Sequence, residues 1–278
     1  MTPAWSEEVV VDGAVAYRVA REGDEFLAEW PGILSMRMRC DEDAPRIATS
    51  RGVEPAFIEK VRRGFLAGLV FHLRGGLAIH ASSIAINGGA IALVGDSRAG
   101  KSTTAAALAL AATTTVLADD ATLVEWQHDR PIVRATESTS WLREDAARAF
   151  GLSPEGDKTA HRVGDEIDAL SSTGAHAPRA FDLRALIILV FDDEAPQAGC
   201  LRPLEGLLQI RALLPAIIRW DRQDPERGRA EVDALAKLSG SVRMFEWTRP
   251  RDLTLLPLQI EAMLPQLRGV SLPHSNLR

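Results

Sequence analysis

The spacing of apolar residues changes twice along the chain. From residue 8 to residue 39, short apolar runs are separated by turn signals such as Asp12-Gly13 and Pro31-Gly32, which predicts a small antiparallel sheet. From Glu54 to Leu73, apolar residues recur at steps of three and four, the spacing of a helix with one buried face. Beyond Leu77, apolar runs of strand length alternate with helical stretches, which is typical of an α/β fold.

The C-terminal half continues this alternation. Ala185–Phe191 is a continuous apolar run, which predicts a strand buried on both faces. Helices are predicted over Trp141–Phe150, Leu204–Arg219, Asp224–Leu238 and Leu253–Leu267. Pro215 is expected to break or kink the second of these. We therefore expect two parts: a small β-rich subdomain over residues 1–53, and an α/β domain over residues 54–278 with helices around its sheet.

The strongest local turn signal is Asn87-Gly88, because a type I′ hairpin turn needs positive φ at both central residues. A two-residue loop there pairs Ala81 with Val94 and places His80 beside Gly95. A lone histidine is often a plain structural residue, but this pairing brings His80 next to the most distinctive stretch of the chain. The sequence leaves both roles open for His80.

That stretch is Gly95-Asp96-Ser97-Arg98-Ala99-Gly100-Lys101-Ser102, which fits the G-x-x-x-x-G-K-[ST] phosphate-binding loop in full. An apolar run precedes it as a strand, and an Ala-rich run follows it as a helix. In such a loop, backbone N–H groups and the helix N-terminus bind phosphate oxygens. The lysine reaches the β- and γ-phosphates, and the hydroxyl of Ser102 is placed to ligate Mg²⁺. We expect the nucleotide to contact every residue of the loop and the next one, Thr103.

A pair of aspartates follows the next predicted strand, Thr115–Ala118. A strand–helix–strand unit makes that strand parallel to the one before the loop, so Asp119 and Asp120 come out at the edge that carries the loop. Successive strand residues point to opposite faces. One carboxylate therefore faces the γ-phosphate, and the other faces Mg²⁺ or a structural partner. A carboxylate at the γ-phosphate either accepts a hydroxyl proton or only ligates magnesium, and the spacing leaves both open.

Taken together, His80, the loop from Gly95 to Ser102, and Leu117-Ala118-Asp119-Asp120 resemble the HPr kinase/phosphorylase family in order and in separation. The resemblance implies that His80 and Lys101 assist at the phosphates and that Asp119 deprotonates a serine hydroxyl of the substrate. It assigns Ser102 to Mg²⁺, and we place Asp120 with it. It also implies ATP and Mg²⁺ as cofactors and a sheet of the HPr kinase and phosphoenolpyruvate carboxykinase type. Because HPr kinases are hexamers, a homo-oligomer is implied as well.

The chain departs from the family pattern in several places. Arg98 stands where the family usually has glycine, and the Glu-Ile-Arg-Gly stretch after the double aspartate is absent. Glu144 lies at a suitable distance to replace a metal-binding glutamate, but its surroundings equally predict the start of an ordinary helix. The N-terminal region is shorter than in full HPr enzymes. In this the chain resembles small HPr-kinase-like proteins of lasso-peptide pathways, which phosphorylate a serine of a ribosomal precursor peptide.

The predicted function is therefore an ATP-dependent serine kinase that acts on a peptide or protein. Two alternatives share the same phosphate machinery: a nucleotide-binding regulator that transfers no phosphate, and a kinase of small-molecule hydroxyl groups. The N-terminal sheet is either a platform that recognises the acceptor or a packing appendage.

Charge and cysteine content narrow the class of partner. A net charge of −6 does not favour a nucleic-acid partner, and no apolar run approaches the roughly 18 residues of a membrane span. The two cysteines, Cys40 and Cys200, carry no metal-site spacing and fit a reducing compartment. Met1–Val10 lacks the apolar centre of a signal peptide. We expect a cytoplasmic protein with no membrane or nucleic-acid partner.

Overall fold

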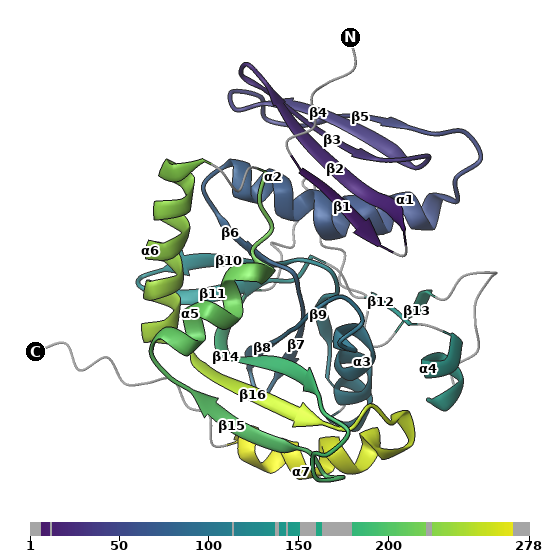
Figure 1. Cartoon of the computed structure of the whole chain (residues 1–278), viewed down its shortest axis with the longest axis vertical. Coiled ribbons are helices and arrows are strands. Elements are labelled where there is room, and N and C mark those ends of the chain that lie inside the picture. Colours follow the sequence, from purple (N-terminus) through teal and green to yellow (C-terminus); the bar gives the residue numbers. More distant parts are fainter. Residues whose placement is uncertain are drawn as a thin grey trace, which may run out of the picture.

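The computed structural model describes residues 7–11, 13–112, 114–136, 139–142, 144–150, 160–162, 180–220 and 224–268. Within these ranges the strands form a five-stranded sheet, a nine-stranded sheet and a two-stranded sheet, and helices pack on both faces of the largest sheet (Figure 1). The predicted α/β class is confirmed as a mixed α/β fold with a curled sheet. The more specific expectation, a sheet of the HPr kinase and phosphoenolpyruvate carboxykinase type, stays a prediction.

The N-terminal sheet is antiparallel, and its strands follow chain order. They are β1 (Glu7–Val11), β2 (Ala14–Glu22), β3 (Glu25–Trp30), β4 (Leu34–Arg39) and β5 (Arg46–Thr49). The sequence predicts the first four and misses β5, which is short and has little buried surface. In β4, buried and exposed residues alternate strictly, so one face of the sheet is apolar and needs a partner.

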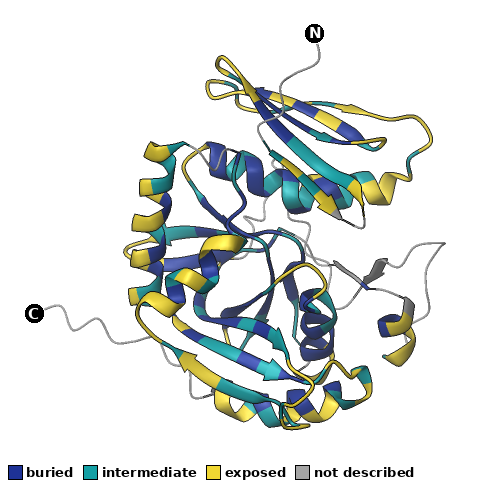
Figure 2. Ribbon diagram, in the orientation of Figure 1, coloured by how far each residue is buried: buried dark blue, intermediate teal, exposed yellow. Residues whose placement is uncertain are grey.

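A helical segment covers that face (Figures 1 and 2). It consists of α1 (Pro55–Val61), a π-helical turn η1 (Arg62–Leu66) and α2 (Ala67–Leu73). The sequence predicts one uninterrupted helix here. The structure instead breaks the helical dihedrals at Gly64, where φ is −85° and ψ is −111°. A Cβ at Gly64 would lie 2.9 Å from the Cβ of Asp120, so the helix approaches the larger sheet too closely for any other residue.

One apolar core joins the sheet, the helical segment and a distant part of the chain. Trp220 is buried in it, with its ring 5.5 Å from that of Phe26, and its indole N–H donates to the carbonyl of Leu69 at 2.8 Å. The N-terminal sheet is therefore packed against residues that lie beyond the predicted boundary. The division into residues 1–53 and 54–278 stays a prediction.

The nine-stranded sheet curls around one long strand, β14 (Ala180–Phe191). The first residues of β14 pair with β11, and the rest lies between β8 and β16, parallel to both. The other strands are β6 (Leu77–Ile79), β7 (Ala81–Ile86), β8 (Gly89–Val94), β9 (Val116–Ala118), β10 (Thr122–Gln127), β11 (Arg130–Arg134), β15 (Cys200–Leu204) and β16 (Arg243–Arg249).

The predicted hairpin between β7 and β8 is confirmed. Ala81 pairs with Val94, and both turn residues have positive φ, 48° at Asn87 and 76° at Gly88. Because β7 is antiparallel to both β8 and β9, those two strands run in the same direction, as predicted. The strands β8, β9, β14 and β16 therefore all end at one edge of the sheet.

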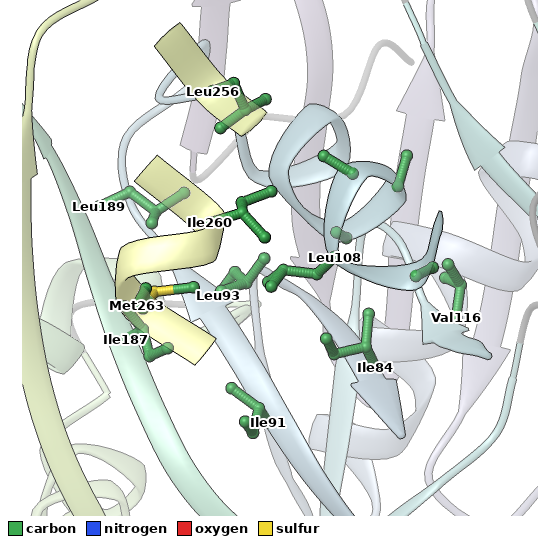
Figure 3. Close-up of a cluster of buried hydrophobic side chains, with 14 of the residues drawn as sticks. Ile84, Ile91, Leu93, Leu108, Val116, Ile187, Leu189, Leu256, Ile260 and Met263 are labelled. Carbon is green, nitrogen blue, oxygen red and sulfur yellow. The ribbon is translucent and has the colours of Figure 1, made fainter. Parts of the chain in front are cut away.

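Residues of β8 face two separate cores. Ile91 and Leu93 pack against α3 (Lys101–Ala112) and α7 (Leu256–Arg268), as Figure 3 shows. Ala92 and Val94 face the core under α5 (Leu207–Leu213) and α6 (Pro225–Ser241). This double burial explains why the strand before the loop is uniformly apolar.

Two predicted helices of the C-terminal half begin later than expected. The sequence predicts a helix from Trp141, but Trp141 ends strand β12 (Thr139–Trp141), which pairs with β13 (Ala160–Arg162); α4 is Glu144–Ala149. The helix predicted from Leu204 begins only after β15 ends, as α5. The predicted break at Pro215 is confirmed: a 3-10 turn η2 (Leu214–Ala216) follows α5, because proline cannot continue a helix.

The last predicted helix is present, with a 3-10 turn η3 (Leu253–Leu255) leading into α7. In the part of the chain that the structure describes, no helix is both long enough and apolar enough to cross a bilayer.

We predict that Trp220→Ala lowers the free energy of unfolding by about 3–5 kcal/mol, because it leaves a cavity in the core shared with the N-terminal sheet. Trp220→Phe is the matched control. It keeps a ring against Phe26 but leaves the Leu69 carbonyl without its donor, so it should cost about 1–3 kcal/mol. Urea unfolding measures both. A loss under about 1 kcal/mol for Trp220→Ala would contradict a shared core.

Candidate functional site

A cavity of about 650 Å³ opens at the edge where the parallel strands end. Its wall combines the loop between β8 and α3, the corners at which the chain enters β7 and β10, and the loops after β14 and β16. It is lined by His80, Ser97, Arg98, Gly100, Lys101, Ser102, Thr103, Asp120, Asp145, Ala146, Phe191, Arg249, Arg251, Asp252, Leu253 and Leu256. The edge thus collects polar groups from stretches far apart in the sequence.

The glycine-rich loop from Gly95 to Gly100 connects β8 to α3, as the sequence predicts. A Cβ at Gly95 would lie 2.9 Å from the Cβ of Ala99, and Gly100 has φ of 82°, so both positions require glycine. Arg98 also adopts positive φ, 68°, which costs a non-glycine residue about 1–3 kcal/mol. The position where the resembled family has glycine is therefore a strained one in this chain.

Lys101 is the first residue of α3 and is only 7% exposed. Its ammonium group donates to the carbonyl oxygens of Gly95 at 2.9 Å and Asp96 at 3.0 Å. Burial lowers the pKa of Lys101, and the nearby carboxylates, Asp120 first, oppose that shift. Its direct partners are neutral carbonyls, and an anion in the cavity would be a stronger partner than either of them.

His80 lies at the corner where the chain leaves β6 and enters β7, and its backbone N–H donates to the carbonyl of Ala216 at 2.7 Å. The imidazole lines the cavity, with its ring 6.0 Å from that of Phe65. Burial and then the Lys101 cation lower the pKa of His80 to about 4. The imidazole is therefore neutral at pH 7.

The two aspartates occupy different environments. Asp119 is 1% exposed and lies outside the residues that line the cavity; the hydroxyl of Ser82 donates to its Oδ1 at 3.0 Å. Asp120 lines the cavity, with 29% of its side chain exposed. The assignment of Asp119 as the base stays a prediction, but these positions favour Asp120 for direct contact with a ligand.

A residue that sequence reasoning missed lies beside Asp120. The ammonium group of Lys60, on α1, is 3.6 Å from Asp120 Oδ2. The same cation contributes to the lowered pKa of His80. No local pattern points to Lys60, because its contact depends on the close approach of the helix at Gly64.

Sequence reasoning also missed the far end of the cavity. Arg249, the last residue of β16, is 4% exposed, and its guanidinium carbon lies 4.8 Å from the ring centroid of Phe191. Arg251 lies over the same ring at 4.5 Å. A signal was present: two arginines follow a strand that is parallel to the others, and ligands of such sheets bind at the carboxyl ends of the strands.

The lining residues fit a nucleoside triphosphate with Mg²⁺. Lys101 and the loop suit phosphates, while Ser102 and Asp120 offer the hard oxygen donors that Mg²⁺ uses in small number beside phosphate and water. Among the described residues, no three His, Cys, Asp or Glu side chains gather as a metal cluster. The side chain of Glu144, at the first position of α4, lies outside the described residues, and its neighbour Asp145 lines the cavity.

Comparisons with known proteins add little to this geometry. No family profile matches the sequence, and no curated protein matches it. Among solved structures, the Hpr(Ser) kinase/phosphatase from Coxiella burnetii matches with a TM-score of 0.35 and 14% identity, over 69% of this chain and 95% of that chain. A likeness at that level supports no inference about function, so we infer function from the residues of the cavity.

We predict that acid destabilises the protein through His80. Its folded-state pKa of about 4 lies below the ordinary 6.5, so between these values the unfolded chain binds more protons than the folded chain. The stabilisation is present above about pH 6.5 and is lost as the pH falls toward 4. Urea unfolding across this range measures the slope.

His72 is the comparison. Burial also lowers the pKa of His72 to about 4, so His80→Asn should reduce the slope without removing it. An identical slope in His80→Asn and in the natural protein would contradict a buried neutral imidazole at this site.

Proposed function

We propose that this protein is an ATP-dependent serine kinase that phosphorylates a peptide or protein. The observation that carries the proposal is the content of one cavity: a glycine-rich loop with the buried cation Lys101, a carboxylate from another stretch, Asp120, and a neutral imidazole, His80. The loop and Lys101, which suit phosphate binding, and the Asp120 carboxylate, which can accept a proton, therefore line the same cavity.

The phosphate end consists of the loop and the start of α3. Loop N–H groups and the positive end of the α3 dipole favour anions at this position. Lys101 exchanges its two carbonyl acceptors for phosphate oxygens, which form stronger, charge-assisted hydrogen bonds. Bound ATP with Mg²⁺ supplies the γ-phosphoryl group and part of the charge compensation. Arg98 holds the loop in a strained backbone conformation, and contacts to a bound phosphate would offset part of that cost.

The acceptor end consists of Asp120, Lys60 and His80. One carboxylate oxygen of Asp120 accepts the proton of the attacking hydroxyl, and the other stays available to Mg²⁺. At the same time the hydroxyl oxygen forms its bond to the γ-phosphorus, and the bond from that phosphorus to the β-phosphate oxygen breaks. The ammonium group of Lys60 lies 3.6 Å from Asp120 Oδ2 and pairs with this carboxylate beside the acceptor position. Asp119 supports the position of Asp120 and does not react itself. The hydroxyl of Ser82 lies 2.7 Å from the backbone carbonyl of Asp119, and this contact fixes the chain next to Asp120.

The choice of acceptor rests on the sequence resemblance alone. Serine on a peptide, including a precursor peptide of the lasso type, is the class that the resemblance implies, and a homo-oligomer and a cytoplasmic location stay predictions with it. Incubation of the purified protein with γ-labelled ATP, Mg²⁺ and a panel of serine peptides, each paired with its Ser→Ala control, tests the proposal. Label on the serine peptides alone supports it. Nucleotide binding without transfer would instead favour a regulator, and label on a small hydroxyl compound alone would favour a small-molecule kinase.

We predict that Asp120→Asn lowers the rate of phosphate transfer by about 100-fold or more, because the amide cannot accept the hydroxyl proton. Asp119→Asn should lose about tenfold or less, and Ser82→Ala should reproduce that loss, since both alter only the support of the neighbouring residue. Single-turnover transfer and ATP binding are measured for each variant. An inactive Asp119→Asn beside an active Asp120→Asn would restore Asp119 as the base, as the family resemblance implies.

A further inference from the structure

Among the described residues, no anionic group balances the buried charge of Arg249. The residue is 4% exposed, and among the described residues no carboxylate pairs with it. Its Nε has no hydrogen-bond partner. Burial lowers the pKa of Arg249 to about 10, which still leaves the guanidinium charged at neutral pH. A buried cation without an anion is costly, so its retention at the wall of a cavity calls for an explanation.

The hydrogen bonds that Arg249 makes to neighbouring helices do not require its positive charge. Nη2 of Arg249 donates to Thr104 Oγ1 on α3 at 2.9 Å, and Nη1 donates to Gln259 Oε1 on α7 at 3.2 Å. Both acceptors are neutral, so the brace between the two helices compensates the cation only weakly. The partner Gln259 is fully buried, and its own Nε2 lacks a partner. A neutral donor would make the same two contacts at a lower desolvation cost.

The guanidinium lies directly behind the glycine-rich loop. A Cβ on Gly100 would approach Arg249 Nη2 to 3.2 Å and Phe191 Cζ to 3.5 Å. Arg251 lies over the ring of Phe191, with its guanidinium carbon 4.5 Å from the ring centroid. Its Nη2 lies 3.5 Å from the carbonyl oxygen of Arg98, in the glycine-rich loop. Two cations and one ring therefore flank the loop on the β16 side.

The cavity is polar along the sheet edge. The strands lie in the order β9, β7, β8, β14, β16, with Asp120 following β9 and Arg249 ending β16. The loop that holds Lys101 lies between these ends. Two acidic residues also line the cavity, Asp145 and Asp252, and the Asp252 carboxylate accepts hydrogen bonds from Thr254 N at 2.8 Å and Thr254 Oγ1 at 2.7 Å.

We infer that Arg249 and Arg251, with Phe191, form a second anion subsite that binds the phosphate nearest the nucleoside. This deepens the proposed function and rests on it. The nucleotide then lies along the edge with its nucleoside toward β16 and its terminal phosphate toward Asp120, where the acceptor hydroxyl enters. The bound phosphate supplies the negative charge that none of the described residues provides for Arg249.

The test compares nucleotides of different phosphate number. Calorimetry measures the affinity of the full chain for ATP, ADP and AMP with Mg²⁺, in the natural protein, Arg249→Met and Lys101→Met. Arg249→Met should weaken all three nucleotides by about 10- to 100-fold, the effect of one or two lost charged hydrogen bonds. Lys101→Met should weaken ATP and ADP far more than AMP. Arg243→Gln, at the exposed opposite end of β16, is the matched control and should change none of them.

Urea unfolding of the ligand-free proteins is the second measurement. Arg249→Met should be as stable as the natural protein or more stable, because methionine fills a similar volume without the desolvation cost. If Arg249→Met does not fold, Arg249→Lys and Arg251→Gln take its place, and each should weaken AMP binding by about 3- to 10-fold.

The outcomes separate this inference from the proposed function. Natural affinities in Arg249→Met, with loss in Lys101→Met, would overturn the subsite and leave the kinase proposal standing. Weakened ATP with unchanged AMP in Arg249→Met would overturn the orientation, because the guanidinium would then lie at a distal phosphate. A natural protein that binds no nucleotide would overturn both.

Discussion

The structure depends most on where it holds the ammonium group of Lys101. The group is almost fully buried, and two carbonyl oxygens of its own loop are its partners. That arrangement exists because β8 is followed directly by Gly95, where no side chain fits, and because Gly100 turns the chain through positive φ into α3. A buried ammonium group that donates only to neutral carbonyls is compatible with folding, yet a bound anion would stabilise it much more strongly. The loop and helix α3 therefore hold this ammonium group at the wall of the cavity, where an anion can bind it.

The rest of the cavity follows from the directions of the strands. Since β8, β9, β14 and β16 all end at one edge of the sheet, residues from four stretches that are separated in the sequence meet there. The helix under the N-terminal sheet joins them at its π-helical turn, where Gly64 allows it to approach Asp120 and Lys60 reaches that carboxylate. The N-terminal sheet thus packs on the helix that supplies a cation to the site. This continuity gives the sheet a physical link to the cavity beyond simple packing.

The features that could be predicted from the sequence are those that neighbouring residues determine. The register of β7 on β8 was predicted from Asn87-Gly88, because a two-residue type I′ turn favours this pairing; the neighbouring Gly89 left a one-residue slip open, and the structure does not have it. Strand–loop–helix order and the direction of β9 were predicted for similar local reasons. The late start of the helix predicted from Leu204 and the missed Lys60 share another cause: both depend on tertiary packing, which no short pattern encodes. Burial likewise separated Asp119 from Asp120, since alternation along a strand shows that they differ but not which one faces the cavity.

The central claim is that one cavity holds a triphosphate between Lys101 and Asp120. A crystal structure with Mg²⁺ and a non-hydrolysable ATP analogue tests it most directly. We expect the Lys101 ammonium to leave the carbonyls of Gly95 and Asp96 for the β- and γ-phosphates, with the γ-phosphate facing Asp120 and His80. A nucleotide bound elsewhere, or a Lys101 that keeps both carbonyl contacts beside a bound nucleotide, would contradict the account.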